Sequence, residues 1–298
     1  MKIGLIGLGK MGYNLALNLK RNNHDVVAYD VNQEALNSIS QQGIAAVNSL
    51  VELVQALNNM KVIWLMIPAG KIIDSTLNDL KKLLSTDDII IDGGNSNYND
   101  TVRRAADLAQ AGIKYLDCGT SGGTEGALNG ICAMIGGEKS AFDYCETIFK
   151  DISLPGGYLY CGASGAGHYV KMVHNGIEYG MMQAIAEGFE VLNQSEFDLN
   201  LAAVAGLWNQ GSVVRSWLME LTERALVKDP GLNSIKGIMQ SSGEGKWTLE
   251  TALEKQIPTP VIALSVIMRY RSLQEDTFAG KVVAALRNEF GGHSVIKS

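Results

Sequence analysis

Two patterns of apolar and polar residues alternate along the first half of the chain. Short runs of β-branched and other apolar residues are separated by stretches in which apolar residues recur every three or four positions. Such runs are typical of buried strands, and such stretches of amphipathic helices. Their regular succession predicts an α/β domain with a mostly parallel sheet. The expected strands are residues 3–6, 25–29, 61–67, 88–91, 114–118, 131–135 and 157–161, and the expected helices are 11–21, 33–41, 49–57, 72–84 and 98–110.

The alternation stops after Cys161, where a glycine-rich segment, residues 162–167, precedes a different pattern. From Gly167 to about Asn193 the chain has no proline and keeps a helical spacing of apolar residues, which predicts one long helix. Further helices are expected at 199–210, 213–227, 248–256, 261–273 and 277–290. We therefore predict two domains, an α/β domain over residues 1–163 and an all-α C-terminal domain over residues 164–298.

Charge and composition exclude several classes of protein. The 25 Lys and Arg residues are outnumbered by 31 Asp and Glu, for a net charge of −6, whereas a nucleic-acid binder normally has a basic surface. No apolar stretch approaches the roughly 20 residues of a membrane span, and the N-terminus is too short and too rich in glycine for a secretion signal. The 4 cysteines include no CxxC pair, which fits reduced thiols. We expect a cytoplasmic protein that binds neither nucleic acid nor membrane.

A glycine motif follows the first predicted strand directly. It reads Gly7-Leu8-Gly9-Lys10-Met11-Gly12 and opens the first helix. In this context Gly7 permits a tight turn, Gly9 lets backbone N–H groups reach a pyrophosphate, and Gly12 lets the helix pack on the strand. The helix N-terminus favours the anion. The motif predicts a doubly wound Rossmann domain that binds a dinucleotide, and the alternative is a glycine turn that binds no nucleotide.

Asp30, at the end of the second predicted strand, indicates which dinucleotide fits. A carboxylate there accepts hydrogen bonds from a free ribose 2′-hydroxyl and repels a 2′-phosphate. We therefore expect NAD, although Asp30 could instead be the N-cap of the next helix. The further cofactor contacts that we expect are Val31, Asn32, Ile67, Pro68, Ala69 and Asn95.

Five polar side chains share one face of the long helix predicted after residue 167. They are Lys171, His174, Asn175, Glu178 and Tyr179, at positions i, i+3, i+4, i+7 and i+8. The alternative is a solvated helix face with an ordinary Lys to Glu pair. An imidazole and an amide are poor helix formers, and Gly176 and Gly180 leave room for a ligand. These features favour a substrate site.

At these residues the chain resembles the 6-phosphogluconate dehydrogenase family, the decarboxylating enzymes of the pentose phosphate route, in its short NAD-preferring branch. The resemblance spans nearly the whole chain and is carried by residues 7–12, 92–96, 121–123, 171–179, 245–248 and 287–293. Relatives that oxidise small β-hydroxyacids look similar at the glycine loop, at residues 121–123, at Lys171 and at Asn175. They are not similar at Glu178 or at the terminal Arg and His.

The resemblance implies a reaction and a role for each polar residue. Lys171, when neutral, would take the proton of the 3-hydroxyl as hydride leaves C3 for the nicotinamide. As an ammonium it would then stabilise the oxygen that gains charge as carbon dioxide departs. Glu178 would protonate C1 of the enediol, and Asn175 belongs to the catalytic set. The carboxylate and hydroxyls would be held by Asn95, Ser121, Gly122, Gly123, His174 and Asn175.

The resemblance also assigns the substrate phosphate to Tyr179, Arg269, Arg287 and His293. Arg suits a phosphate because its planar fork donates two parallel hydrogen bonds. In the family the counterparts of Arg287 and His293 come from a neighbouring subunit's tail. The resemblance therefore implies a homo-oligomer, a dimer or a tetramer, with shared sites.

Departures from the family and rival functions complete the interpretation. Ser242 and Glu244 stand where the longer enzymes of the family have Lys and Thr, and a carboxylate beside a phosphate is unfavourable unless it points away. One rival is a β-hydroxyacid dehydrogenase acting on a small unphosphorylated acid, which Glu178 opposes. The other is a non-catalytic nucleotide-binding sensor, which needs neither the base Lys171 nor an acid.

Metal binding is not expected. His168 and His174 lie six residues apart, about 240° around a helix, and no Cys or carboxylate completes a ligand set.

Overall fold

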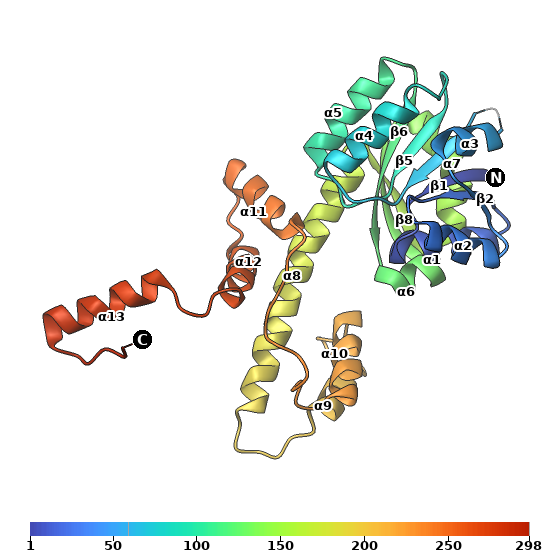
Figure 1. Ribbon diagram of the computed structural model, residues 1–298. Coiled ribbons are helices and arrows are strands. Elements are labelled where there is room, and N and C mark those ends of the chain that lie inside the picture. The colour runs from blue at the N-terminus through green and yellow to red at the C-terminus, as the bar shows by residue number, and fades with distance from the viewer. Residues whose placement is uncertain (59, 298) are drawn as a thin grey trace. The chain divides into compact units, whose positions relative to one another are not determined.

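The computed structural model describes residues 1–58 and 60–297. It contains two compact units, Met1–Asn175 and Gly176–Ser298. The first holds a sheet with helices α1 to α7, and the second is helical (Figure 1). The long helix α8, Ala166–Asn193, begins in the first unit and continues into the second. The predicted fold class, an α/β Rossmann domain followed by an all-α domain, is confirmed.

An eight-stranded sheet forms the centre of the first unit, in the order β3-β2-β1-β4-β5-β6-β7-β8. Neighbouring strands are parallel except β6 and β7. The strand order reverses beside β1, and sheets of this kind bind ligands at the carboxyl ends of the strands there. The strands are β1 Lys2–Ile6, β2 Asp25–Tyr29, β3 Ala45–Val47, β4 Val62–Leu65, β5 Ile89–Asp92, β6 Lys114–Ser121, β7 Ile131–Gly137 and β8 Ser153–Gly162.

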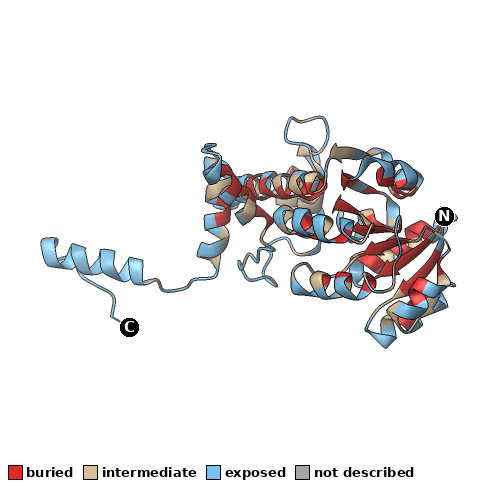
Figure 2. Ribbon diagram, turned by 90° about the horizontal axis from the view of Figure 1, so that it is seen from above, coloured by how far each residue is buried: buried red, intermediate tan, exposed pale blue. Residues whose placement is uncertain are grey.

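Helices cover both faces of this sheet because its central strands carry apolar side chains on both sides. In β4, Trp64 lies in one core with α1, α2 and α7, whereas Ile63 and Leu65 lie in a second core with α3, α4 and α5. A strand buried on both faces needs a continuous apolar run, which β4 and β5 have. Figure 2 shows the buried strands between helices with exposed outer faces. These helices are α1 Lys10–Arg21, α2 Gln33–Gln41, α3 Leu50–Ala56, α4 Lys71–Leu80, α5 Tyr98–Ala109, α6 Gly123–Asn129 and α7 Lys139–Ile152.

The first unit has three elements beyond the predicted ones, β3, α6 and α7. β3 has 3 residues and α6 has 7, too few for a period to emerge. In α7 the buried residues Phe142, Cys145, Phe149 and Ile152 recur at helical spacing, so this helix has a sequence signal that the prediction overlooked.

Over its described residues, up to 297, the second unit continues α8 and adds five further helices, of which α9 packs on α10 and α11 on α12. None of the residues of α13 is buried, and the helix is exposed along its length (Figure 2). Among the described residues, no helix combines the length and the hydropathy that crossing a membrane requires. The five helices are α9 Leu201–Trp208, α10 Trp217–Lys228, α11 Glu244–Glu254, α12 Pro260–Ser272 and α13 Phe278–Gly291.

Candidate active site

The glycine loop joins β1 to α1, and its three glycines are required for different reasons. Gly7 has φ +98°, and a Cβ there would lie 2.4 Å from the carbonyl oxygen of Met66. A Cβ on Gly12 would lie 2.0 Å from the carbonyl oxygen of Gly7, so this glycine lets the helix close on the loop. A Cβ on Gly9 would meet nothing within 4 Å. Gly9 is therefore not needed for packing within the chain, and the space beside it is available to a ligand.

The N-terminus of α1 presents an electropositive end. Gly9 is its N-cap and supplies no side-chain hydrogen bond, and the first turn contains no acidic residue. Backbone N–H groups at such an end are suited to an anion such as a pyrophosphate. Lys10 is exposed and Met11 half-buried there, whereas Leu8 is buried in the core.

Asp30 binds the glycine loop rather than capping α2. Its carboxylate accepts hydrogen bonds from the backbone N–H of Leu8 at 2.5 Å and of Asn32 at 2.8 Å. The N-cap of α2 is Asn32, whose side chain accepts from Glu34 and Ala35, so the alternative role of Asp30 as a cap is wrong. A carboxylate has about four lone-pair sites, which leaves acceptor capacity for a ribose hydroxyl. Val31 beside it is 91% exposed.

Two loops follow β4 and β5 at the same edge of the sheet. Ile67 packs against the second core, while Pro68 and Ala69 are exposed. After β5, Asn95 is exposed between Gly94 and the buried Ser96. Both neighbours hydrogen-bond the buried carboxylate of Asp92, through the Gly94 N–H at 3.0 Å and the Ser96 hydroxyl at 2.8 Å. The fold therefore presents the Asn95 side chain on a fixed loop.

The end of β6 meets α8 within the first unit. The hydroxyl of Ser121 lies 3.2 Å from Nε2 of His174, and Nδ1 of His174 lies 3.0 Å from Oδ1 of Asn175. Gly122 and Gly123 follow with φ of +115° and +58°, a left-handed turn that favours glycine. The structure thus joins Ser121, His174 and Asn175 in one hydrogen-bonded chain, although 53 residues separate the first two.

Lys171 lies on the same segment of α8 and is buried, with 7% of its surface exposed. A Cβ on Gly119 of β6 would come within 2.3 Å of the Cβ of Lys171, so only glycine lets the strand and the helix approach here. A buried Lys is rare unless it is paired or functional. Its burial beside the polar chain one turn away makes Lys171 the candidate base of this region.

Asp117 is a residue of this region that the sequence analysis missed. It is fully buried on β6 and accepts hydrogen bonds from the backbone N–H groups of Gly165 at 2.8 Å and His168 at 2.9 Å. Its carboxylate therefore holds the first turn of α8, the helix that carries Lys171. The sequence signal for such a residue is an acidic side chain inside an apolar strand, because a buried charge is costly unless it has partners.

The second unit contains the remaining predicted residues. Glu178 is half-buried and Tyr179 is buried on α8, and the guanidinium carbon of Arg269 lies 3.7 Å from the centre of the Tyr179 ring. Glu244, at the start of α11, is buried with one carboxylate oxygen accepting from the Ser242 hydroxyl at 2.5 Å. The Ser242 N–H donates to the Tyr179 hydroxyl at 3.4 Å. Tyr179 and Arg269 are thus brought together, with a carboxylate in the same cluster.

Arg287 and His293 lie at the far end of α13. Gly292 ends this helix with φ +62°, and the His293 N–H donates to the carbonyl oxygen of Arg287 at 3.4 Å. Both side chains are exposed, and neither is placed against Tyr179 or Arg269 by a contact among the described residues.

Comparison with known proteins identifies the family. Residues 2–162 match the family model described as the NAD binding domain of 6-phosphogluconate dehydrogenase, and residues 167–294 match its C-terminal domain. The chain is 57% identical to "Putative 6-phosphogluconate dehydrogenase YqeC" of Bacillus subtilis, over 100% of both chains. It is 42% identical to an NAD(+)-dependent, decarboxylating 6-phosphogluconate dehydrogenase of Haloferax volcanii, over 100% of this chain and 99% of that one.

Solved structures agree with these matches. The 6-phosphogluconate dehydrogenase of Plasmodium falciparum superposes with a TM-score of 0.86 at 31% identity, covering 100% of this chain and 66% of that one. A 3-hydroxyisobutyrate dehydrogenase of Mycobacterium tuberculosis superposes at 0.72 with 22% identity, a likeness of fold alone. Both family models, the relatives and the shared fold agree with the resemblance found in the sequence. The chain belongs to the 6-phosphogluconate dehydrogenase family.

Proposed function

We propose that this protein catalyses the oxidative decarboxylation of 6-phosphogluconate to ribulose 5-phosphate and carbon dioxide, with reduction of NAD. The observation that carries the proposal is the buried Lys171, one helical turn from the hydrogen-bonded chain of Ser121, His174 and Asn175. The Haloferax volcanii relative is named as an NAD(+)-dependent, decarboxylating enzyme, which supports the choice of reaction and cofactor.

The residues around the glycine loop fit a dinucleotide. The uncapped N-terminus of α1 would face the pyrophosphate, and the open space beside Gly9 would let it approach. Asp30, already held by two backbone N–H groups, would accept from a ribose 2′-hydroxyl and repel a 2′-phosphate. When bound, NAD accepts the hydride that leaves C3 of the substrate.

Lys171 and Glu178 would carry the proton transfers. Neutral Lys171 takes the 3-hydroxyl proton as the C3–H bond breaks, which forms a 3-keto acid. The C1–C2 bond then breaks, carbon dioxide leaves, and the ammonium of Lys171 gives its proton to the oxygen that gains the electron pair. Glu178 protonates the carbon that lost the carboxylate, and Lys171 takes back the proton of the former 3-hydroxyl as the ketone forms. The proton that Lys171 finally holds replaces the one that Glu178 gave, so the protons balance.

The polar residues beside Lys171 would hold the substrate. His174 and Asn175, fixed by their mutual hydrogen bond, would present donors to the hydroxyls, and the left-handed turn at Gly122 and Gly123 would leave room for the carboxylate. At the other end, Tyr179 and Arg269 would bind the phosphate, joined by Arg287 and His293.

A second copy of the chain is part of this proposal. The apolar residues Phe278, Val282, Leu286 and Phe290 recur along one side of α13, and all are at least 40% exposed. A helix with an exposed apolar face of this length is stable only when another surface covers it. We infer a homo-oligomer in which the neighbouring subunit covers α13. The tail residues Arg287 and His293 of one subunit would then reach the substrate site of the other.

One assay tests the reaction against its rivals. Purified protein is mixed with NAD and either 6-phosphogluconate or 3-hydroxyisobutyrate, and absorbance at 340 nm and released carbon dioxide are followed. We expect both signals with 6-phosphogluconate only. Turnover of 3-hydroxyisobutyrate alone would indicate a β-hydroxyacid dehydrogenase, and NAD binding without turnover of either acid would indicate a sensor.

A further inference from the structure

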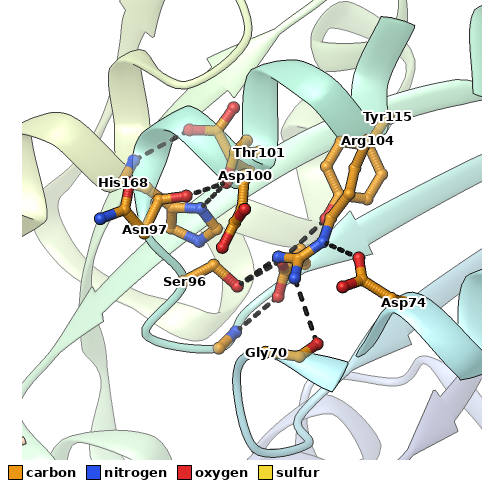
Figure 3. Close-up of polar contacts among 12 residues, drawn as sticks. Gly70, Asp74, Ser96, Asn97, Asp100, Thr101, Arg104, Tyr115 and His168 are labelled. Carbon is orange, nitrogen blue, oxygen red and sulfur yellow. Dashed lines mark hydrogen bonds and ion pairs between the residues drawn. The ribbon is translucent and has the colours of Figure 1, made fainter. Parts of the chain in front are cut away.

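Arg104 of α5 is a buried cation that contacts both of the loops following β4 and β5. Its side chain is 2% exposed. Its Nε donates to Asp74 at 2.8 Å, one NH2 group donates to the carbonyl oxygen of Gly70 at 3.2 Å, and the other donates to the Ser96 hydroxyl at 3.2 Å (Figure 3). Three donors of one guanidinium therefore bind three acceptors on two segments of chain.

The Ser96 contact connects Arg104 to the loop that carries Asn95. Ser96 in turn donates to Asp92 at 2.8 Å, and Asp92 also accepts from the Tyr115 hydroxyl at 2.8 Å and from the Gly94 N–H at 3.0 Å. The Arg104 guanidinium lies 4.0 Å from this buried carboxylate. Both residues flanking Asn95 are thus held by one buried carboxylate, whose charge Arg104 compensates.

The Gly70 and Asp74 contacts connect Arg104 to the loop of Ile67, Pro68 and Ala69. Gly70 ends that loop with φ +90° and is the N-cap of α4, and Asp74 lies in the first turn of this helix. The hydrogen bond from Arg104 lowers the pKa of Asp74, with a second contribution from Arg103. The carboxylate of Asp74 is therefore charged at neutral pH and keeps the start of α4 attached to Arg104.

We propose that Arg104 is a positioning residue that sets the separation between the loop of residues 67–70, expected to contact the cofactor, and the loop of residues 93–97, which presents Asn95 to the substrate. This assignment rests on the proposed function for its kinetic consequence. Hydride transfer requires donor and acceptor carbons at a defined distance, so a change in loop separation slows that step in particular. Lys cannot replace Arg here, because a single ammonium lacks the planar fork that reaches three acceptors at once.

Arg103 provides a matched control on the same helix. It also pairs with Asp74, at 3.0 Å, and with Asp100 at 3.4 Å, but its side chain is 58% exposed. Among the described residues its hydrogen bonds go to Asp74 and Asp100, and none goes to Gly70 or Ser96. Arg103→Met therefore removes one ion pair of Asp74 and leaves the connection between the loops in place, whereas Arg104→Met removes the connection.

Hydrogen exchange measured by mass spectrometry tests the connection without any activity. In Arg104→Met, we expect peptides covering 67–71 and 93–97 both to exchange about tenfold faster or more, as for loss of hydrogen bonds to a charged group. In Arg103→Met both peptides should exchange as in the unaltered protein. Ser96→Ala should speed exchange in 93–97 alone, and this variant carries the test if Arg104→Met does not fold. Unchanged exchange at 93–97 in Ser96→Ala, or unchanged exchange in both loops of a folded Arg104→Met, would overturn the assignment.

The primary deuterium isotope effect on turnover tests the kinetic consequence. With 6-phosphogluconate deuterated at C3, the isotope effect on kcat should rise in Arg104→Met. It should rise in Arg104→Lys as well, because Lys does not restore the connection between the loops. A merely structural role would lower the amount of active protein and leave the isotope effect unchanged. If the unaltered protein does not oxidise 6-phosphogluconate, the proposed function fails, while the exchange experiment still decides whether Arg104 connects the loops.

Discussion

At the scale of single residues, different glycines of the glycine loop serve packing and ligand binding. A Cβ on Gly12 has no space, whereas a Cβ on Gly9 meets nothing, and Gly9 has φ −60°, which alanine adopts freely. We expect Gly12→Ala to lower the free energy of unfolding by about 1–3 kcal/mol, the range for overpacking. Gly9→Ala should leave stability nearly unchanged and weaken NAD binding. Urea unfolding and NAD titration check both variants, and equal NAD affinity in Gly9→Ala and the unaltered protein would contradict this interpretation.

Cofactor choice is also decided by single residues. Asn32 caps α2, so replacing it with Arg would remove a cap that contributes about 0.5–2 kcal/mol. Val31 is almost fully exposed beside Asp30 and is the better position for a cation. We expect Asp30→Ala with Val31→Arg to shift kcat/KM from NAD toward NADP. The prediction fails if the unaltered protein uses both dinucleotides with equal efficiency.

Variants of Lys171 and Glu178 should be defective in different steps of the proposed reaction, the oxidation and the protonation of carbon. Lys171→Met keeps the buried stem and removes the base, so NADH formation should stop while NAD still binds. Glu178→Gln keeps shape but cannot give a proton to carbon, so turnover should fall by about 10²–10⁴ with substrate affinity retained. Stopped-flow measurement of NADH, together with the yield of ribulose 5-phosphate, checks both. Ribulose 5-phosphate formed at the original rate in Glu178→Gln would exclude Glu178 as the acid.

At the scale of elements, the position of α8 is set by its first turn. Asp117 of β6 binds two backbone N–H groups at this end, and Gly119 lets the helix pack closely at Lys171. A strand residue therefore positions a helix residue 54 places later (171 − 117). This placement explains why Lys171 is buried on a helix that carries several polar residues.

A pH dependence of stability arises where His24, the residue before β2, contacts Asp151 of α7. Burial, and next the positive N-terminus, lower the pKa of His24 below its ordinary value of 6.5, although Asp151 at 3.1 Å opposes the shift. The unfolded chain therefore binds the proton more readily, so stability is present above pH 6.5 and is lost as the pH falls toward the lower folded-state pKa.

His24→Gln tests this dependence. Urea unfolding between pH 8 and pH 5 should show a smaller loss of stability in His24→Gln than in the unaltered protein. Parallel curves for His24→Gln and the unaltered protein would contradict the prediction.

At the scale of the whole molecule, the proposal of sites shared between subunits concerns the exposed tail. Deleting residues 287–298 should raise the KM for 6-phosphogluconate strongly and leave NAD affinity almost unchanged. Each lost phosphate contact contributes about 1.5–3 kcal/mol, the range for hydrogen bonds to charged groups.

Subunit exchange distinguishes a shared tail from one that serves its own subunit. When the tail-deleted protein is mixed with Lys171→Met, a hybrid oligomer can combine an intact tail with an intact Lys171. Activity should then reappear. An inactive mixture, despite exchange proven by mass spectrometry, would mean that the tail acts within its own subunit.

The amino-acid sequence by itself determined the features that depend on local spacing. The apolar runs of β4 and β5, the glycine motif and the polar stripe on α8 are each contained in a few consecutive turns or strands. The order of α/β and helical parts followed from the same patterns. Homology added the family, and with it the proposed reaction, because the residues of the stripe do not by themselves distinguish catalysis from a solvated surface.

Only the tertiary structure decided which distant residues meet. That Asp30 binds the glycine loop, that Ser121 pairs with His174, and that Arg104 joins two loops depend on strand order and on packing across the sheet. These contacts have no period in the sequence. They form because buried polar groups must find partners wherever folding brings them, and the partners lie up to 53 residues away along the chain.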